Sequence, residues 1–251
     1  MQRYEEALSV LTRQIFSRQL KAGDKLPTEK QLSEELGIDK TSLRVALKQL
    51  ESMQLLTIRQ GDGMYVKNFM EEAGIDFLRT MFVLQKTENK DWLIDEYILD
   101  EIWEFWIAFF PEILRLAATR SSARDIKEAL ESLDVMVSCI DDREKVVEFN
   151  LKIQDLVCKV ANNMVITLLL NSFHPLKRIM SEFFINSMDK KEIEEYIKMM
   201  RRLIRSVMTA SDKDISNIAE QLRKDLTIYR EKTRELWKTS ATDKDGECDV
   251  L

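Results

Sequence analysis

The sequence predicts a mainly α-helical protein: a small N-terminal domain of helices with one β-hairpin, followed by a larger all-α antiparallel bundle. Only 6 glycines and 3 prolines interrupt 251 residues, a composition that favours long helices over a turn-rich β fold. Apolar residues at helical spacing also continue from residue 68 almost to the end of the chain. We therefore expect a compact domain over residues 1–67, a linker and connecting helix over 68–90, the bundle over 91–238 and a disordered tail over 239–251.

Three helices are expected in the first domain. The first, Arg3–Leu20, places five apolar residues on one face: Ala7, Leu8, Leu11, Ile15 and Phe16. Thr28, with Gln31 three residues later, forms a capping-box pattern that begins a second, short helix ending at Gly37. Asp39 is a favourable N-cap for a third helix. The few residues between the second and third helices predict a helix-turn-helix.

The third helix has two different faces. Its buried stripe is expected to contain Leu43, Ala46, Leu47 and Leu50. The opposite face carries cations four residues apart, namely Lys40, Arg44 and Lys48. Two short β-prone runs then follow, Leu55–Arg59 and Met64–Lys67, on either side of the turn Gln60–Gly63. This pattern predicts a β-hairpin, the wing of a winged helix-turn-helix.

The remaining chain predicts seven long helices in an antiparallel bundle. They are expected at Ile75–Leu84, Trp92–Leu116, Ala123–Cys139, Arg143–Val160, Met164–Phe184, Lys190–Ala210 and Asp212–Trp237. We find no glycine-rich phosphate loop, nucleophile elbow or carboxylate–histidine cluster in this sequence. An enzyme built on the bundle is therefore a remote alternative.

Charge is distributed unevenly along the chain. The net charge is −6, but residues 1–67 hold 11 Lys and Arg against 9 Asp and Glu, a net of +2, which leaves −8 on the remainder. An acidic protein of this kind can approach nucleic acid only through a basic face on its small domain.

Three scattered cysteines fit a reducing cytoplasm, and no apolar run is long enough for a signal region or a membrane span. We expect a cytoplasmic protein without a membrane partner.

The segment Ala22–Val66 resembles the winged-helix domain of the GntR family of regulators. The matching positions, in order and spacing, are Gly23, Leu26, Pro27, Glu29, Leu32, Gly37, Thr41, Arg44, Ala46, Leu47, Leu50, Gly61, Gly63 and Val66. Asn68–Met81 is similar to the linker of the fatty-acid-responsive FadR branch of that family. The resemblance implies a transcription regulator, not an enzyme, that binds pseudo-palindromic double-stranded operator DNA as a homodimer.

The resemblance also implies which residues contact DNA: Lys30, Lys40, Thr41, Arg44, Gln60 and Gly61. Arginine can offer a bidentate fork to guanine, lysine can neutralise phosphate, and a glycine lets the wing backbone approach the minor groove. Two lysines, Lys30 and Lys40, stand where FadR-like proteins often have arginine, and Asp39 stands where a threonine could contact phosphate. The operator is therefore expected to differ, because lysine cannot reproduce a bidentate contact. For each cation the alternative is a solvated surface charge.

Many relatives with this helical domain bind a divalent metal through one Asp and three His. The first two ligand positions align here with Asn150 and Gln154, and the only histidine, His174, lies near a helix boundary, where a cap or a core role is more common than ligation. Neutral amides are poor ligands for such a cation. We expect no metal and no cofactor.

A stretch of large apolar residues, Ile102–Phe110, contains no arginine and predicts an aromatic pocket wall. The candidate effector-pocket residues are Trp103, Trp106, Phe109, Phe110, Asn150 and Gln154. The alternative is that the aromatic residues only fill the bundle or a dimer interface. With the FadR resemblance, the missing metal ligands suggest a long-chain fatty acyl-CoA as effector and control of fatty acid metabolism as the role. The alternative effector is another small metabolite, an organic acid or another apolar ligand.

Overall fold

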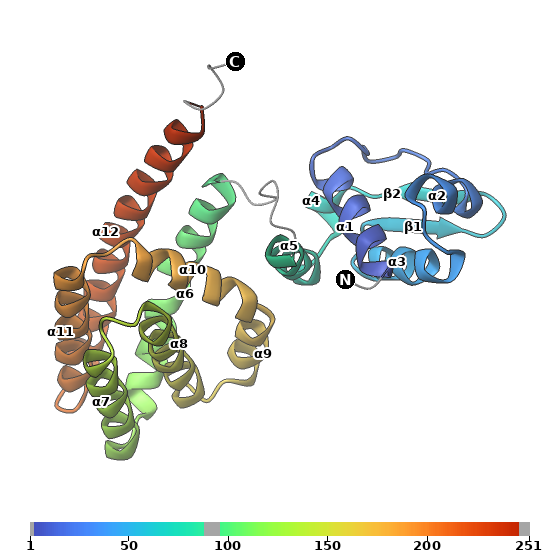
Figure 1. Ribbon diagram of the computed structural model, residues 1–251. Helices are drawn as coiled ribbons and strands as arrows, with labels where there is room; N and C mark the ends of the chain where they lie inside the picture. Colours follow the sequence, from blue (N-terminus) through green and yellow to red (C-terminus); the bar gives the residue numbers. More distant parts are fainter. Residues whose placement is uncertain (1–2, 88–95, 246–251) are drawn as a thin grey trace. The chain divides into compact units, whose positions relative to one another are not determined.

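The computed structural model describes residues 3–87 and 96–245. The chain divides into two compact units, Met1–Ile94 and Asp95–Leu251, which are described separately (Figure 1). Helices dominate both units, and the described residues contain one antiparallel sheet of two strands. The mainly α fold class expected from the sequence is confirmed.

In the first unit, helices α1 (Arg3–Phe16), α2 (Glu29–Leu36) and α3 (Lys40–Ser52) form the core. The apolar stripes of α1 and α3 are buried as expected, apart from Phe16, which is only half-buried: the buried residues are Ala7, Leu8, Leu11 and Ile15 on α1 and Leu43, Ala46, Leu47 and Leu50 on α3. Helix α1 ends four residues earlier than the sequence suggests. Arg18 adopts a left-handed φ of 59°, a conformation that stops a helix.

Local capping sets the ends of α2 and α3. Thr28 and Gln31 form the complete capping box, and Gly37 ends α2 with a φ of 65°. The Asp39 carboxylate accepts a hydrogen bond from the Ser42 backbone N–H at 2.9 Å. All three caps lie where the sequence predicts them.

The wing consists of strands β1 (Leu56–Arg59) and β2 (Gly63–Val66). They pair antiparallel, with Leu56 opposite Val66 and Arg59 opposite Gly63. Gly61 in the connecting turn has a φ of 79°, which favours glycine. The hairpin lies where the sequence predicts it, although β2 begins at Gly63, a residue expected in the turn.

The segment expected as a linker and connecting helix, residues 68–90, contains two helices, α4 (Phe69–Glu72) and α5 (Ile75–Thr87), the second where the sequence predicts a helix. The ring of Phe69 lies 5.9 Å from that of Phe16 and 5.5 Å from that of Phe77. Residues 69–77 thus pack on α1 through aromatic contacts instead of running free. Residues 88–90, the rest of the expected linker, lie outside the described part of the chain, as do 91–95 at the start of the expected bundle.

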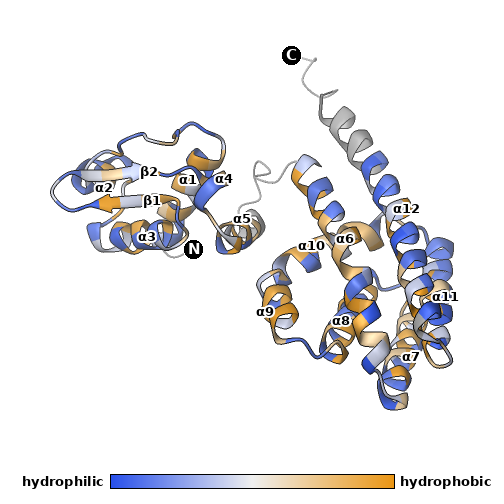
Figure 2. Cartoon of the chain, turned by 180° about the vertical axis from the view of Figure 1, so that it is seen from behind, coloured by the Kyte–Doolittle hydropathy of each residue, from blue (hydrophilic) through white to orange (hydrophobic). Residues whose placement is uncertain are grey.

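The second unit is a bundle of helices. In chain order they are α6 (Glu96–Arg120), α7 (Ala123–Ser138), α8 (Arg143–Val160), α9 (Met164–Ser172), α10 (His174–Asn186), α11 (Lys190–Val207) and α12 (Asp212–Asp245). Figure 2 shows that α9 is hydrophobic along most of its length, whereas α12 is largely hydrophilic. The bundle core draws residues from α6, α8 and α11, among others.

Two predicted boundaries are wrong. The expected helix Met164–Phe184 is divided at Phe173, because Pro175 lacks a backbone donor and its ring obstructs the preceding turn, so that α10 starts afresh there. The tail expected to be disordered from residue 239 is helical as far as Asp245, because α12 continues along its own axis through residues compatible with a helix. Residues 246–251 lie outside the described part.

Helix α6 contains a proline that the bundle accommodates. Pro111 cannot donate to the Ile107 carbonyl, the acceptor one turn earlier. Arg223 on α12 supplies the missing donor: its Nη1 lies 3.2 Å from the Ile107 oxygen and 3.5 Å from the Ala108 oxygen. Arg223 thus links α12 to α6 at the Ile107 carbonyl, which has no helical donor because of the proline.

A second link between α6 and α12 is ionic. Asp100 accepts hydrogen bonds from Arg230, at 2.7 and 2.6 Å, and from Arg234, at 2.6 and 2.5 Å. The hydrogen bonds from Arg230, and then those from Arg234, hold the pKa of Asp100 well below its usual range. Both links fix α6, the helix that carries the aromatic stretch, against the C-terminal helix.

Candidate functional site

The exposed face of the winged unit collects the cations expected from the sequence. On α3, Lys40, Thr41 and Arg44 are exposed, opposite the buried stripe. Lys30 on α2 is exposed as well. Spacings of three and four residues place the α3 side chains on one face of the helix, free of the core.

An ion pair that the sequence does not indicate orients Arg44. Its Nε donates to the Glu29 Oε2 at 2.8 Å, although the Arg44 side chain is 64% exposed. Because this contact uses Nε, the two terminal nitrogens of the guanidinium remain for another acceptor. The contact also holds the start of α2, with Lys30 next to Glu29, beside the exposed face of α3. The 15 residues that separate Glu29 and Arg44 give no local pattern from which to predict the pair.

The wing tip is held by a polar cluster. Asp62 accepts a hydrogen bond from the Tyr65 hydroxyl at 2.9 Å and from Lys25 Nζ at 3.3 Å, and these bonds lower the pKa of the Asp62 carboxyl. The Arg59 guanidinium lies 4.7 Å from the centre of the Tyr65 ring. Gln60, like Gly61, is exposed within this braced turn. Arg59 is a cation of the wing that sequence reasoning did not single out.

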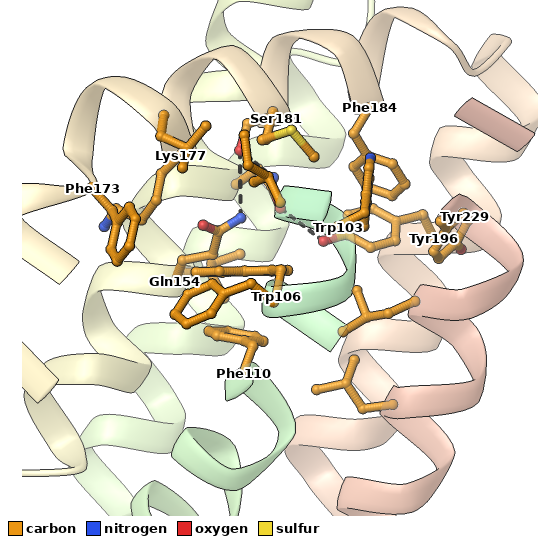
Figure 3. Close-up of a pocket in the computed structure, with 18 of the residues that line it drawn as sticks. Trp103, Trp106, Phe110, Gln154, Phe173, Lys177, Ser181, Phe184, Tyr196 and Tyr229 are labelled. Atoms are coloured by element: carbon orange, nitrogen blue, oxygen red, sulfur yellow. Dashed lines mark hydrogen bonds between the residues drawn. The ribbon is translucent and has the colours of Figure 1, made fainter. Parts of the chain in front are cut away.

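The helical unit contains a partly open cavity of about 60 Å³. Trp103, Trp106 and Phe110 line it from α6, and Asn150 and Gln154 from α8 (Figure 3). Five of the six candidate pocket residues thus lie together around one cavity. Phe109 does not line it; its ring stacks on that of Phe105, with the centroids 5.2 Å apart.

A hydrogen-bonded polar network lies in one wall of this cavity. Asn150 Nδ2 and Gln154 Nε2 donate to Ser181 Oγ on α10, at 3.2 and 3.4 Å. The Tyr196 hydroxyl on α11 donates to Asn150 Oδ1 at 2.7 Å, and burial raises the pKa of this tyrosine. The amides expected at metal-ligand positions are therefore bonded to a serine and a tyrosine. Within residues 3–87 and 96–245, no three His, Cys, Asp or Glu side chains are grouped as metal ligands would be.

A buried lysine also borders the cavity. The Lys177 side chain is 5% exposed and its Nζ forms an ion pair with Asp155 Oδ1. His174, at the start of the same helix, is exposed and does not line the cavity, so it belongs neither to the core nor to the cavity wall.

A second, more apolar cavity, also of about 60 Å³, adjoins the first. The two share four lining residues, Phe110, Ile153, Met200 and Leu222. The second cavity continues between α6, α7, α8 and α11 toward the far ends of these helices, with a lining that includes Leu114, Ile126, Leu156 and Val207. A partly polar cavity and an almost wholly apolar cavity thus share side chains in their linings.

Comparison with known families accounts for nearly the whole chain. Residues 3–66 match the gntR family of bacterial regulatory proteins, and residues 67–244 match the FadR C-terminal domain. The chain belongs to the GntR family, in its FadR branch. Proteins of this family are transcription regulators that bind DNA, and they are not enzymes. The resemblance inferred from the sequence is confirmed.

Curated relatives of this FadR-type regulator carry regulatory names. The chain is 26% identical, over 225 residues, to the fatty acid metabolism regulator protein of Shewanella pealeana, covering 85% of this chain and 83% of that protein. It is 29% identical, over 173 residues, to the HTH-type transcriptional regulator Mce2R of Mycobacterium tuberculosis, covering 67% and 68%.

Among solved structures, Lar, which controls expression of the agr system of Listeria monocytogenes, aligns with a TM-score of 0.54 at 13% identity. The alignment covers 90% of this regulator and 95% of Lar. At this identity the likeness supports the fold alone. Among the described residues, no helix combines the length and apolar character needed to span a bilayer.

Proposed function

We propose that this FadR-type regulator acts in the cytoplasm as a homodimer on pseudo-palindromic operator DNA, and that a long-chain fatty acyl-CoA in its helical unit changes its DNA affinity. By this means it would control fatty acid metabolism, the role named for its Shewanella relatives. The observation that carries the effector assignment is a pair of neighbouring cavities, one partly polar and one almost wholly apolar, whose linings share Phe110, Ile153, Met200 and Leu222.

On the DNA side, we assign base reading to Arg44. Its guanidinium is exposed, is oriented by Glu29, and retains the two terminal nitrogens that a bidentate contact to guanine uses. Lys30, Lys40 and Thr41 are placed to contact phosphate from the exposed sides of α2 and α3. Gln60 and Gly61 are exposed on the braced wing, where the glycine allows close approach to a groove.

Binding of selected operator DNA and of random DNA tests these roles. Arg44→Ala should cost about 1 to 3 kcal/mol on the operator and little on random duplex. Lys40→Ala should instead weaken both duplexes equally and flatten the dependence of affinity on salt. If Arg44→Ala reduced operator and random binding by the same factor, Arg44 would not be a base reader.

On the effector side, a partly polar cavity beside an almost wholly apolar one favours a ligand with a polar end and a long apolar chain. Burial of apolar surface contributes roughly 25 cal/mol per Å², so an acyl chain in the apolar cavity supplies most of the binding free energy. A ligand that prefers one arrangement of the bundle would shift the population of DNA-binding geometries through the segment 68–82.

Titration of palmitoyl-CoA into the full-length protein, with and without operator DNA, tests the effector. We expect saturable calorimetric binding and a change in operator affinity. A ligand at about one hundred times its dissociation constant should also add roughly 2.7 kcal/mol to the free energy of unfolding. Unchanged operator affinity together with no heat of binding would refute the lipid assignment and favour another metabolite.

A further inference from the structure

The indole of Trp103 is the one buried side-chain donor at the main cavity that has no acceptor among the described residues. Trp103 is 4% exposed and lines the cavity, yet its Nε1 has no hydrogen-bond partner. A tryptophan ring is held there by an edge-on contact with Phe184, with centroids 5.9 Å apart. Leaving such a donor unsatisfied costs about 1 to 3 kcal/mol.

The neighbouring polar groups do not satisfy it, because they are bonded to one another. Asn150 Oδ1 already accepts from Tyr196, and Ser181 Oγ accepts from both Asn150 and Gln154. With two hydrogen bonds accepted, the Ser181 hydroxyl has its own proton left as a donor. This end of the cavity therefore offers hydrogen-bond donors and calls for an acceptor oxygen.

The rest of the lining limits what can carry that oxygen. Trp106, Phe110 and Phe173 present aromatic surface, and the adjoining cavity is almost wholly apolar. The cationic side chain at the border, Lys177, is paired with Asp155 and so leaves little net charge to attract a polyanion. An oxygen at the head of a long apolar chain fits these walls.

We propose that the indole N–H of Trp103 donates a hydrogen bond to the carbonyl or carboxylate oxygen of an acyl ligand, and that Ser181 is the second donor at this position. This inference rests on the acyl effector proposed above and names the groups that distinguish an acyl ligand from a plain alkyl chain. The same chemistry is offered by a fatty acyl thioester and by a free fatty acid.

Three ligands and three proteins test the proposal. The ligands are palmitoyl-CoA, palmitate and S-hexadecyl-CoA, a thioether with the same head group and a similar chain but no carbonyl. The proteins are the wild type, Trp103→Phe, which keeps an aromatic ring but loses the N–H, and Trp106→Phe. The last is a matched control, because Trp106 lines the same cavity but is not a buried donor without a partner.

In the wild type and in Trp106→Phe, we expect the better-binding acyl ligand to exceed the thioether about tenfold, the effect of one good hydrogen bond. Trp103→Phe should lose this preference while binding the thioether as the wild type does, which also shows that its cavity is intact. Comparison of palmitoyl-CoA with palmitate then shows whether the acceptor oxygen belongs to an acyl thioester or to a free fatty acid.

Each adverse result has a separate meaning. If the wild type binds an acyl ligand and the thioether equally, or Trp103→Phe keeps the wild-type preference, Trp103 is not the anchor, although the proposed effector stands. If none of the three ligands binds the wild type, both the acyl effector and the anchor are refuted. If Trp103→Phe fails to bind even the thioether, the indole is needed for the cavity itself and the anchoring role is overturned.

Discussion

Replacing Arg223 with alanine should destabilise the helical unit because it exposes a defect that Pro111 creates. The Ile107 carbonyl has lost its helical donor to the proline and accepts from Arg223 Nη1 at 3.2 Å instead. A hydrogen bond from a charged donor contributes roughly 1.5 to 3 kcal/mol. The Arg223 side chain is 33% exposed, so water can replace part of this contact, and we expect Arg223→Ala to cost about 1 to 1.5 kcal/mol.

A double-mutant cycle isolates this effect. Pro111→Ala restores a backbone N–H to the Ile107 carbonyl, so Arg223→Ala should cost about 1 kcal/mol less in that background. Glu112→Ala is the control for the exposed ion pair at 3.4 Å that the same substitution removes, and it should change stability by no more than about 1 kcal/mol.

Urea unfolding, followed by the fluorescence of Trp103 and Trp106 on α6, gives the free energies. The slope against urea should stay constant, so that changes in midpoint report stability. If Arg223→Ala costs the same amount with proline and with alanine at position 111, the carbonyl is not what Arg223 satisfies, and the explanation of how α6 tolerates its proline is wrong.

Three further predictions concern single groups. Asp100→Asn should lower stability at pH 7 by about 1 to 2 kcal/mol, and because the pKa of this carboxyl is held below its ordinary 3.8, the difference from wild type should shrink as the pH of urea titrations falls below that value. Burial raises the pKa of Cys158 from 9.0 to about 11, so in a variant whose other cysteines are serine its thiolate fraction at pH 8 should be about 100-fold below that of an ordinary thiol. Labelling of that variant by Ellman's reagent should then follow protein opening, and rapid labelling in the native state would contradict the assignment. Glu29→Gln should lower the ratio of operator to random DNA affinity by releasing Arg44, whereas Glu35→Gln, the same charge change on an exposed residue of the same helix, should leave that ratio unaltered.

Local rules made the winged unit predictable from the sequence. The capping box of Thr28 and Gln31, the Asp39 cap and the turn around Gly61 each depend on residues within a few positions of one another. The features that the sequence analysis predicted wrongly do not follow from such short-range patterns. The break before Pro175 follows from proline chemistry that a continuous apolar pattern concealed, and the packing of Phe69 on Phe16 joins residues that no spacing rule connects.

Part of the cavity lining was also predictable from a local pattern, the helical periodicity of α6. The periodicity of α6 identifies an aromatic face, and it places Trp103, Trp106 and Phe110 close together. It does not show that Phe109 is absent from the lining, although Phe105, on which its ring stacks, is present there. Nor can it show that Ser181 bonds to Asn150, 31 residues away.

The amide pair on α8 decides which ligands the cavity can accept. A ligand set of one Asp and three His would hold a cation there, and the cation would compensate the charge of a small dicarboxylate. Asn150 and Gln154 are neutral and are engaged with Ser181, so such an anion would have to lose its hydration without a metal counter-charge. Desolvation therefore disfavours small polyanions, whereas the proposed acyl ligand would bring only one polar oxygen to the same wall. If the acyl ligand proposed above is the effector, neutral amides in place of metal ligands would favour selection by chain length over selection by charge.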